Sequence, residues 1–284
     1  MKWANLLVNE HPRAGLVEQD HVWLHDATDV KDVLSDLAGA ADTARGATRV
    51  PLSSVQLRQP ILRPGKILGI GLNYAAHAKE SVSFAKSTPA SVQKWFNKQS
   101  TAANGPYDPV HLPMVSEQLD YEAELVAIIG KTGRHVPAAR AHELVAGYCC
   151  GCDVSVRDWQ RASQTMIMGK GFDTHAPFGP FLVTPDEIED FSALEVRGYV
   201  NGELRQSGHA RDMVFSLAEQ IAHLTQAFTL EPGDVIFTGT PAGVGAGFDP
   251  PKWLRAGDRV RVEISGLGHI ENEILGEPGL TVLE

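Results

Sequence analysis

The later part of the chain is organised as short β-strand patterns that are separated by turn sequences. The clearest is EVRGYVNGELRQS (195–207), in which strand-like residues alternate on both sides of Asn201-Gly202. A type I′ hairpin turn needs positive φ at both central positions, and Asn-Gly tolerates this conformation well. The segment therefore predicts an antiparallel hairpin, and it limits the fold to one that contains such a sheet.

Four other segments have the composition and length of strands: KILGIGLNY (66–74), ELVAIIG (124–130), DVIFTG (234–239) and DRVRVEISG (258–266). The turn sequences EPGD and RAGD lead into the last two. An amphipathic helix is expected over residues 214–224, because apolar residues recur there at helical spacing behind Asp212, the predicted N-cap. Together the segments predict an α+β chain, predominantly β, built as a twisted, mainly antiparallel roll or barrel.

The first part of the chain has a different pattern of predicted elements. It contains the strand-like VWLHDA (22–27), a helical stretch over residues 29–44 and the proline-marked passage RQPILRPGK (58–66). We therefore predict a small N-terminal domain, residues 1–62, followed by a larger β-roll domain, residues 63–284.

The charge of the chain restricts its partners. The formal net charge is −10, from 35 acidic and 25 basic residues, which disfavours a broad surface for nucleic acid or anionic membrane. The sequence MKWANLLVNEHPRAG has no long apolar segment of the kind found in a leader, and no run of about 18 apolar residues occurs. We expect a cytoplasmic protein whose partners are small molecules or cations, with no nucleic acid and no membrane.

The three cysteines, Cys149, Cys150 and Cys152, are clustered in GYCCGCD (147–153). They offer no disulfide framework with distant partners, and a zinc site would need a second cysteine pair. We expect them to be small buried residues of a strand in a reducing compartment.

Two carboxylates, Glu122 and Glu124, lie two residues apart in LDYEAEL (119–125). The alternation with their neighbours predicts a strand, so both carboxylates project from one face. Like charges about 4 Å apart repel by roughly 1 kcal/mol in water and by several-fold more where the dielectric constant is lower. The pair therefore needs either open solvent, as on the wet outer face of an antiparallel sheet, or a cation.

A third carboxylate would complete a cation site. In GYCCGCDVSVRD (147–158), Asp153 lies on the face that alternates with the apolar residues, and an adjacent strand could bring it beside Glu122 and Glu124. Asp120 shares parity with the pair and is a weaker alternative. Oxygen-rich sites of this kind select hard cations such as magnesium, manganese or calcium.

Three further segments carry polar residues that could act in chemistry. His77 and Glu80 in GLNYAAHAKE (71–80) fall on one face of a helical turn and could form a general-base pair, although an ordinary surface pair has the same spacing. Lys170 in GKGFDTHAPFGP (169–180) could stabilise an oxyanion or could be a solvated loop residue. VIFTGTPAGVGAG (235–247) predicts a turn that a ligand can approach closely, and it lacks the ending of a nucleotide phosphate loop.

In their order and spacing these segments resemble the fumarylacetoacetate hydrolase family, in particular its acylpyruvases and fumarylpyruvate hydrolases. The resemblance runs from about Arg63 to the C-terminus and rests on NYAAHAKE, FNKQSTAANGPYDPVHLP, LDYEAELVAIIGK, GYCCGCDVSVRDWQ, GKGFDTHAPFGP, VNGELRQSG and IFTGTPAGVG. It implies a mixed β-roll, with a small N-terminal domain in many members, and usually a homodimer.

The resemblance also implies roles for individual residues. Glu122, Glu124 and Asp153 would hold Mg²⁺ or Mn²⁺. His77 and Glu80 would be a general-base dyad on a segment that closes over the substrate, and Lys170 would face the substrate oxygens at the metal. Contacts with the substrate are implied for Tyr74, Arg157, Gln160 and Thr240.

The implied reaction is the metal-dependent hydrolysis of a C–C bond in a β-diketo acid, which gives a carboxylic acid and a pyruvate-like acid. One alternative is a decarboxylase or lyase of the same family that acts on oxaloacetate-like or 2,4-diketo-3-deoxy sugar acids. Another is a non-catalytic cation- or sugar-binding domain, which would not need His77, Glu80 or Lys170.

The chain departs from the family pattern at three positions, Cys152, Gly171 and His175. None of them removes an implied metal ligand. We expect them to lie near the pocket and, with the residues between Ser81 and Asn104, to influence which keto acid is accepted.

Overall fold

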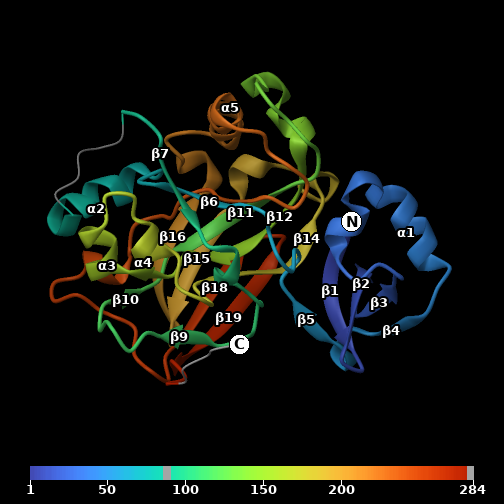
Figure 1. Ribbon diagram of the computed structural model, residues 1–284, viewed down its shortest axis with the longest axis horizontal. Coiled ribbons are helices and arrows are strands. Elements are labelled where there is room, and N and C mark those ends of the chain that lie inside the picture. The colour runs from blue at the N-terminus through green and yellow to red at the C-terminus, as the bar shows by residue number, and fades with distance from the viewer. Residues whose placement is uncertain (86–90, 280–284) are drawn as a thin grey trace.

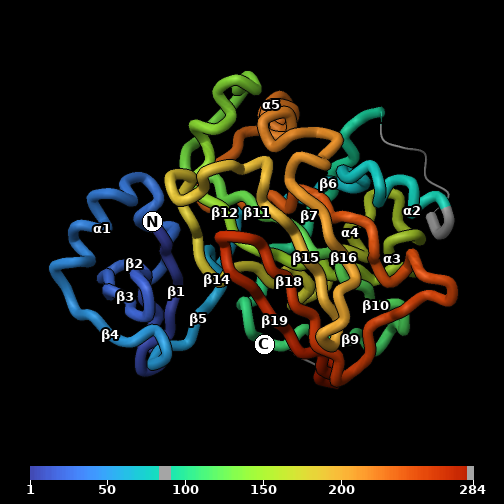
Figure 2. The backbone as a smooth tube through the Cα atoms, turned by 180° about the vertical axis from the view of Figure 1, so that it is seen from behind, coloured from blue at the N-terminus to red at the C-terminus, as the bar shows by residue number. Residues whose placement is uncertain are grey.

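A computed structural model describes residues 1–85 and 91–279 and shows a mixed α+β architecture that is dominated by strands (Figures 1 and 2). The strands are β1 (Lys2–Val8), β2 (His11–Glu18), β3 (His21–Leu24), β4 (Arg49–Pro51), β5 (Gln56–Arg58), β6 (Ile67–Gly71), β7 (Lys94–Lys98), β8 (Ala103–Asn104), β9 (Val110–Leu112), β10 (Leu119–Asp120), β11 (Ala123–Ile129), β12 (Val145–Cys152), β13 (Ser155–Val156), β14 (Ala176–Val183), β15 (Glu195–Val200), β16 (Glu203–His209), β17 (Val235–Phe237), β18 (Arg259–Ile264) and β19 (Gly268–Gly276). The α-helices are α1 (Leu37–Arg45), α2 (Ala75–Ala85), α3 (Arg157–Ala162), α4 (Ile167–Lys170) and α5 (Leu217–Ala227).

Two sheets pack face to face and form the main core. The larger has the order β4-β3-β2-β1-β14-β12-β11-β17-β6-β7, and the smaller has the order β16-β15-β18-β19-β9. Strands β11, β12 and β14 contact β15, β18 and β19, and their facing side chains belong to one buried apolar cluster. Most pairs are antiparallel, but β17–β6, β14–β8 and β19–β9 are parallel. The mixed, predominantly β architecture is therefore confirmed.

The predicted hairpin and turns are present. Strands β15 and β16 pair across Asn201 and Gly202, whose φ values are 52° and 81°, and Gly233 and Gly257 adopt positive φ in the turns before β17 and β18. Only glycine and a few polar residues take up this conformation without large strain. The turn chemistry therefore predicted these connections correctly.

The predicted helix is present as α5, but its predicted N-cap was wrong. The helix begins after Ser216, whose hydroxyl accepts a hydrogen bond from Glu219 N while the Glu219 carboxylate accepts one from Ser216 N. This reciprocal capping box satisfies two amide groups that would otherwise lack partners. Asp212 instead accepts a hydrogen bond from His209 N in a preceding 3₁₀ turn.

The N-terminal residues form the blue unit at one side of the molecule (Figure 1). Strands β1 to β4 extend the large sheet, because β1 pairs with β14 through Lys2–Val183 and Trp3–Leu182. Helix α1 and the 3₁₀ helix Val30–Asp36 contribute to a second apolar cluster, which also contains residues of β11, β12, β14 and β17. The N-terminal unit thus shares both a sheet and a core with the rest of the chain.

Strand β11 lies in the interior of the molecule. All seven of its residues are buried, and the preceding Glu122 is only 6% exposed. The alternative of a wet outer face for Glu122 and Glu124 was therefore wrong. The three cysteines are buried and unpaired on β12, as expected.

Across residues 1–85 and 91–279, no helix has the length and apolar character needed to cross a membrane. Five residues of the segment between Ser81 and Asn104, numbers 86–90, lie outside the described part of the chain.

Candidate metal and catalytic site

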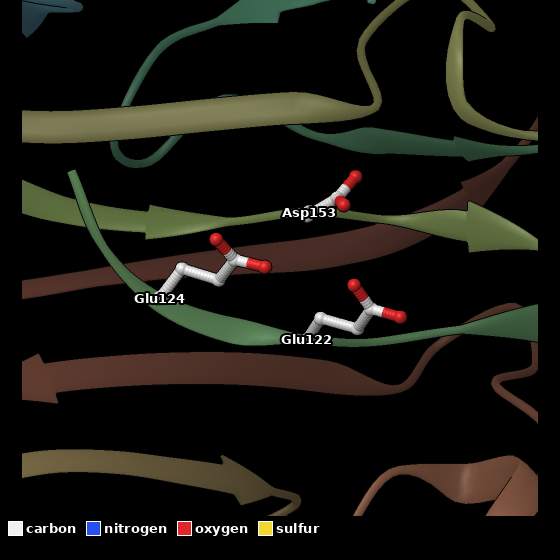
Figure 3. Close-up of side chains that lie close together, drawn as sticks. All are labelled: Glu122, Glu124 and Asp153. Carbon is white, nitrogen blue, oxygen red and sulfur yellow. The ribbon is translucent and has the colours of Figure 1, made fainter. Parts of the chain in front are cut away.

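Three buried carboxylates converge at the end of two paired strands. Figure 3 shows Glu122 and Glu124 on one segment and Asp153 on its neighbour. Ala123 pairs with Cys152, and Asp153 N donates a 2.9 Å hydrogen bond to Glu122 O, so the strand pairing brings Asp153 beside the two glutamates. One ligand atom from each residue lies within 4.8 Å of the others.

Two side chains, Gln206 and Thr240, form hydrogen bonds with the backbone of Ala123, which lies between the two glutamates. Strand β17 pairs with β11 only at Val126 to Ile128, so the backbone of Ala123 needs other partners on that side. Gln206 Oε1 accepts a 2.9 Å hydrogen bond from Ala123 N, and Thr240 Oγ1 donates one of 2.8 Å to Ala123 O. Gln206 Nε2 also donates to Thr240 Oγ1 and to Pro241 O. Gln206 and Thr240 therefore fix the backbone from which both glutamates project.

Two buried lysines neutralise part of the carboxylate charge. Lys170 Nζ lies 2.8 Å from Glu122 Oε2 and 2.6 Å from Asp153 Oδ2. Lys98 Nζ lies 2.5 Å from Asp153 Oδ1 and donates a 3.0 Å hydrogen bond to Val154 O. The Phe96 ring adds a cation–π contact, with its centroid 4.7 Å from Lys170 Nζ. The alternative of a solvated loop position for Lys170 was wrong, because the residue ends α4 and is only 1% exposed.

The pKa values of the two glutamates are shifted in opposite directions. Burial alone would raise the pKa of Glu122, but the charges of Lys170, Arg157 and His77 lower it far below its usual value. Burial raises the pKa of Glu124 well above its usual value, and the charges of Asp153 and Glu122 raise it further. Glu124 is therefore the carboxylate whose negative charge is least compensated by the protein.

These residues fit a divalent cation. The donors are three carboxylates, which hard cations such as Mg²⁺ and Mn²⁺ prefer. Within the described residues, the one hydrogen bond to Glu124 comes from Gly239 N, at 2.8 Å. A cation among the three groups would offset the repulsion that raises the pKa of Glu124. Asp120 does not belong to this set, because its oxygens accept hydrogen bonds from Arg157, Gly245, Ala246 and Tyr121.

Arg157 connects the carboxylate cluster to the cavity wall. Its Nε donates to Asp120 Oδ2 at 2.8 Å, and its Nη1 lies 2.7 Å from Glu122 Oε1. Burial would lower the pKa of Arg157, but Asp120 and Glu122 outweigh it and raise the pKa. The same Nη1 donates to Gln160 Oε1 at 2.9 Å, one helical turn further along α3. Asp120 thus orients the arginine, and the arginine orients Gln160.

His77 and Glu80 form the predicted pair on α2. His77 Nδ1 lies 2.9 Å from Glu80 Oε2, and the second oxygen of Glu80 accepts a 2.9 Å hydrogen bond from Gly243 N. The His77 side chain is 7% exposed. Glu80 therefore joins α2 to the glycine-rich turn after β17 and fixes the orientation of the His77 ring.

A cavity of about 210 Å³ opens onto this centre. Seven of the predicted site residues line it: His77, Glu122, Glu124, Arg157, Gln160, Lys170 and Thr240. Asp153 and Glu80 are not among the lining residues, but Glu80 contacts His77, which is one of them. Tyr74 is buried but lines a separate hollow with Ser207, Asp212 and Pro241. The structure thus brings the predicted catalytic and metal-binding residues together and leaves Tyr74 outside the lining of this cavity.

Five residues at or beside the site were not named individually from the sequence: Lys94, Phe96, Lys98, Arg161 and Gln206. The first three belong to the segment between Ser81 and Asn104 that was expected near the pocket. The sequence gives only weak indications that these five residues belong to a site. KWFNK (94–98) alternates like any amphipathic edge strand, and a glutamine in a hairpin is ordinarily exposed. Conversely, none of the departures from the family pattern, Cys152, Gly171 and His175, is among the lining residues.

Comparison with known sequences agrees with this arrangement. The sequence model described as fumarylacetoacetate (FAA) hydrolase, C-terminal, matches residues 66–275. A mitochondrial oxaloacetate tautomerase of Rattus norvegicus is 42% identical over 227 residues, which are 80% of this chain and 71% of that protein. The corresponding tautomerase of Homo sapiens is 43% identical over 228 residues, with the same two coverages.

Solved structures extend the similarity over nearly the whole chain. A fumarylacetoacetate hydrolase from Exiguobacterium antarcticum superposes with a TM-score of 0.86 at 35% identity, covering 98% of this chain and 100% of that one. A maleylpyruvate hydrolase from Sphingobium sp. SYK-6, in complex with manganese(II) ion and pyruvate, gives a TM-score of 0.81 at 32% identity with the same coverages.

Proposed function

Because the chain belongs to the fumarylacetoacetate hydrolase family, we propose that it is an enzyme that acts on a 2-keto acid, with His77 as the group that transfers protons. The observation that carries this proposal is the convergence of two groups on one cavity. The oriented His77 imidazole and the glutamates of the Glu122, Glu124 and Asp153 cluster both face it. A passive cation site would have no use for the imidazole.

Mg²⁺ or Mn²⁺ at the three carboxylates would supply a Lewis acid and a chelation point for the carboxylate and keto oxygens of the substrate. Arg157 and Lys170 keep positive charge beside this point, and Gln160, held by Arg157, would help to position the substrate. Thr240 already donates its hydroxyl proton to Ala123 O, so we assign it chiefly to positioning of the glutamate backbone.

The specific reaction we propose is hydrolysis of the C–C bond of a β-diketo acid of the acylpyruvate or fumarylpyruvate type. His77 would remove a proton from the water that attacks the carbonyl carbon remote from the acid. As the C–C bond breaks and its electron pair moves to the pyruvate-like fragment, His77 would return the proton to that carbon. Glu80 would stabilise the imidazolium that exists between these two transfers.

Similarity to solved hydrolases supports this reaction. The fumarylacetoacetate and maleylpyruvate hydrolases are covered over their whole length and match 98% of this chain, including its N-terminal unit.

A second candidate is proton transfer on oxaloacetate, either keto–enol tautomerisation or decarboxylation. It is favoured by the identity of 42–43% to the two oxaloacetate tautomerases. In tautomerisation His77 would move a proton between the methylene carbon and the enol oxygen, with no attack by water.

Steady-state assays with Mn²⁺ would distinguish the two candidates. Acetylpyruvate and fumarylpyruvate report hydrolysis through loss of the diketone enol absorbance, and oxaloacetate reports tautomerisation and decarboxylation separately. We expect turnover of at least one acylpyruvate and its loss on chelation of the metal. Turnover of oxaloacetate alone would replace hydrolysis by the second candidate.

Calorimetric titration with Mn²⁺ tests the metal site independently of turnover. We expect Glu122→Ala, Glu124→Ala and Asp153→Ala each to weaken Mn²⁺ binding, whereas Glu273→Ala, at a partly exposed site on β19, provides a matched control. Unchanged Mn²⁺ binding in all three site variants would overturn the assignment.

A further inference from the structure

The cavity contains more positive charge than the carboxylate cluster uses. Four cationic side chains line it: Lys94, Arg157, Arg161 and Lys170. Arg157 and Lys170 are paired with Asp120, Glu122 and Asp153. Within residues 1–85 and 91–279, Lys94 and Arg161 form no ion pair. Two cations thus face the cavity without a carboxylate partner from the described chain.

Lys94 lies at a fixed place along the wall. It belongs to β7, where alternate residues project from one face, so Lys94, Phe96 and Lys98 share a face. Lys98 contacts Asp153, and the Phe96 ring lies under Lys170. With a rise of about 3.3 Å per residue, the Cα of Lys94 is about 13 Å from that of Lys98. The strand therefore carries Lys94 away from the carboxylate cluster, toward the other end of the cavity.

Arg161 lies one turn beyond Arg157 on α3. Residues four apart lie on the same helical face, so Arg161 continues the row that begins with Arg157 at Glu122. Whereas Arg157 is 3% exposed, Arg161 is exposed and donates a hydrogen bond to the neutral side chain of Gln118. Strand β7 therefore carries Lys98 at the carboxylate cluster and Lys94 further along the cavity wall, and α3 carries Arg157 at the cluster and Arg161 nearer solvent.

We propose that Lys94 and Arg161 form a distal anion subsite, which binds the second carboxylate of a dicarboxylic keto acid. This inference rests on the proposed function, because it takes the 2-keto acid end of the substrate to lie at Glu122, Glu124 and Asp153. Charge-assisted hydrogen bonds to a carboxylate are strong, so the subsite selects diacids over keto acids with an apolar end.

Two unreactive probes of equal chain length isolate this subsite. Both 2-oxoadipate and 2-oxohexanoate have six carbons and a 2-keto acid end, but only the first has a distal carboxylate. Calorimetry with the Mn²⁺-loaded protein should show 2-oxoadipate binding about 10- to 100-fold more tightly than 2-oxohexanoate, the usual effect of hydrogen bonds to a charged group.

Two variants and one control assign the preference to residues. Lys94→Met and Arg161→Met keep an apolar stem and remove the charge, and each should reduce the preference for 2-oxoadipate by about 10-fold without changing the Kd of 2-oxohexanoate. Lys94→Arg should retain the preference. Lys131→Met removes one charge from an exposed site outside the cavity and should leave the preference unchanged, which controls for net charge.

Equal affinities of wild type for the two probes, or a preference that survives in both Met variants, would overturn the subsite. Failure of the proposed function would give a different experimental result. Oxalate, which can occupy only the keto-acid end, would then fail to bind in the presence of Mn²⁺, whatever the ratio between the six-carbon probes.

Discussion

Lys98 and Asp153 form an ion pair that is shielded from solvent on all sides. Lys98 Nζ lies 2.5 Å from Asp153 Oδ1, and both side chains have 0% exposure. Burial lowers the pKa of Lys98, and the nearby charge of Lys170 lowers it further, while Asp153 opposes both. The pair links edge strand β7 to the carboxylate cluster, so the stability of this strand is coupled to the state of the cluster.

Lys98→Met should lower the free energy of unfolding of the metal-free protein by about 3 kcal/mol, because the buried Asp153 loses one of its two lysine partners and keeps only Lys170. Saturating Mn²⁺ should recover part of the loss, since a cation neutralises the same carboxylates. Urea unfolding with and without Mn²⁺ measures both effects. Lys66→Met, which breaks a partly exposed contact with Glu231 and Asp234, should cost less. Equal costs would contradict the role of the buried pair.

Gln206→Leu should destabilise the protein by about 3 kcal/mol, because the amide of Ala123 and the carbonyl of Pro241 lose buried partners. It should also weaken Mn²⁺ binding, since Ala123 lies between two of the carboxylates. Urea unfolding and calorimetry measure the two effects. Gln226→Leu, at an exposed position of α5, is the matched control. Normal Mn²⁺ affinity in Gln206→Leu would show that the glutamine stabilises the hairpin without positioning the glutamates.

Much of this site could be predicted because its signals are local. The two-residue spacing of Glu122 and Glu124 and the three-residue spacing of His77 and Glu80 follow from the periods of a strand and a helix. The turn at Asn201-Gly202 follows from backbone sterics. In each case a few consecutive residues are enough to predict the local structure.

The remaining features depend on contacts between distant segments. Lys98 meets Asp153 across 55 positions of the sequence, and Gln206 meets Ala123 across 83. Nothing within KWFNK or NGELRQ distinguishes a buried partner from an exposed polar residue. The N-cap at Asp212 was wrong for a related reason: two polar residues, Asp212 and Ser216, precede the same apolar pattern, and only the reciprocal bonds with Glu219 select Ser216.

His175 should make stability depend on pH below neutrality. Burial lowers its pKa from 6.5 to about 3, so between these values the unfolded chain binds a proton that the folded chain does not. Stability that is present above pH 6.5 is therefore lost as the pH falls, by about 2 kcal/mol between pH 6.5 and pH 5.

Comparison of wild type with His175→Gln in urea at pH 7 and pH 5 tests this effect. The variant keeps a donor for His111 O, which His175 Nε2 approaches at 2.8 Å, but cannot take up the proton. We expect a smaller loss of stability on acidification in the variant. The same loss in both proteins would show that His175 is not responsible.

A homodimer remains a prediction from the family resemblance, and a cytoplasmic location remains a prediction from the sequence pattern. Light scattering of the purified protein at micromolar concentration should give about twice the chain mass of 30.7 kDa. A mass equal to that of one chain would remove the dimer prediction.

The proposed role of His77 in proton transfer is tested most directly by His77→Ala, assayed with Mn²⁺ on the best acylpyruvate alongside calorimetric oxalate binding. The kcat should fall by about 10² to 10⁴, the usual contribution of a positioned general base. Oxalate affinity should stay close to that of wild type, because the carboxylates proposed to hold the metal are unchanged. Glu80→Gln should show a smaller loss of kcat of the same kind. Near-normal hydrolysis by His77→Ala would contradict the proposed role.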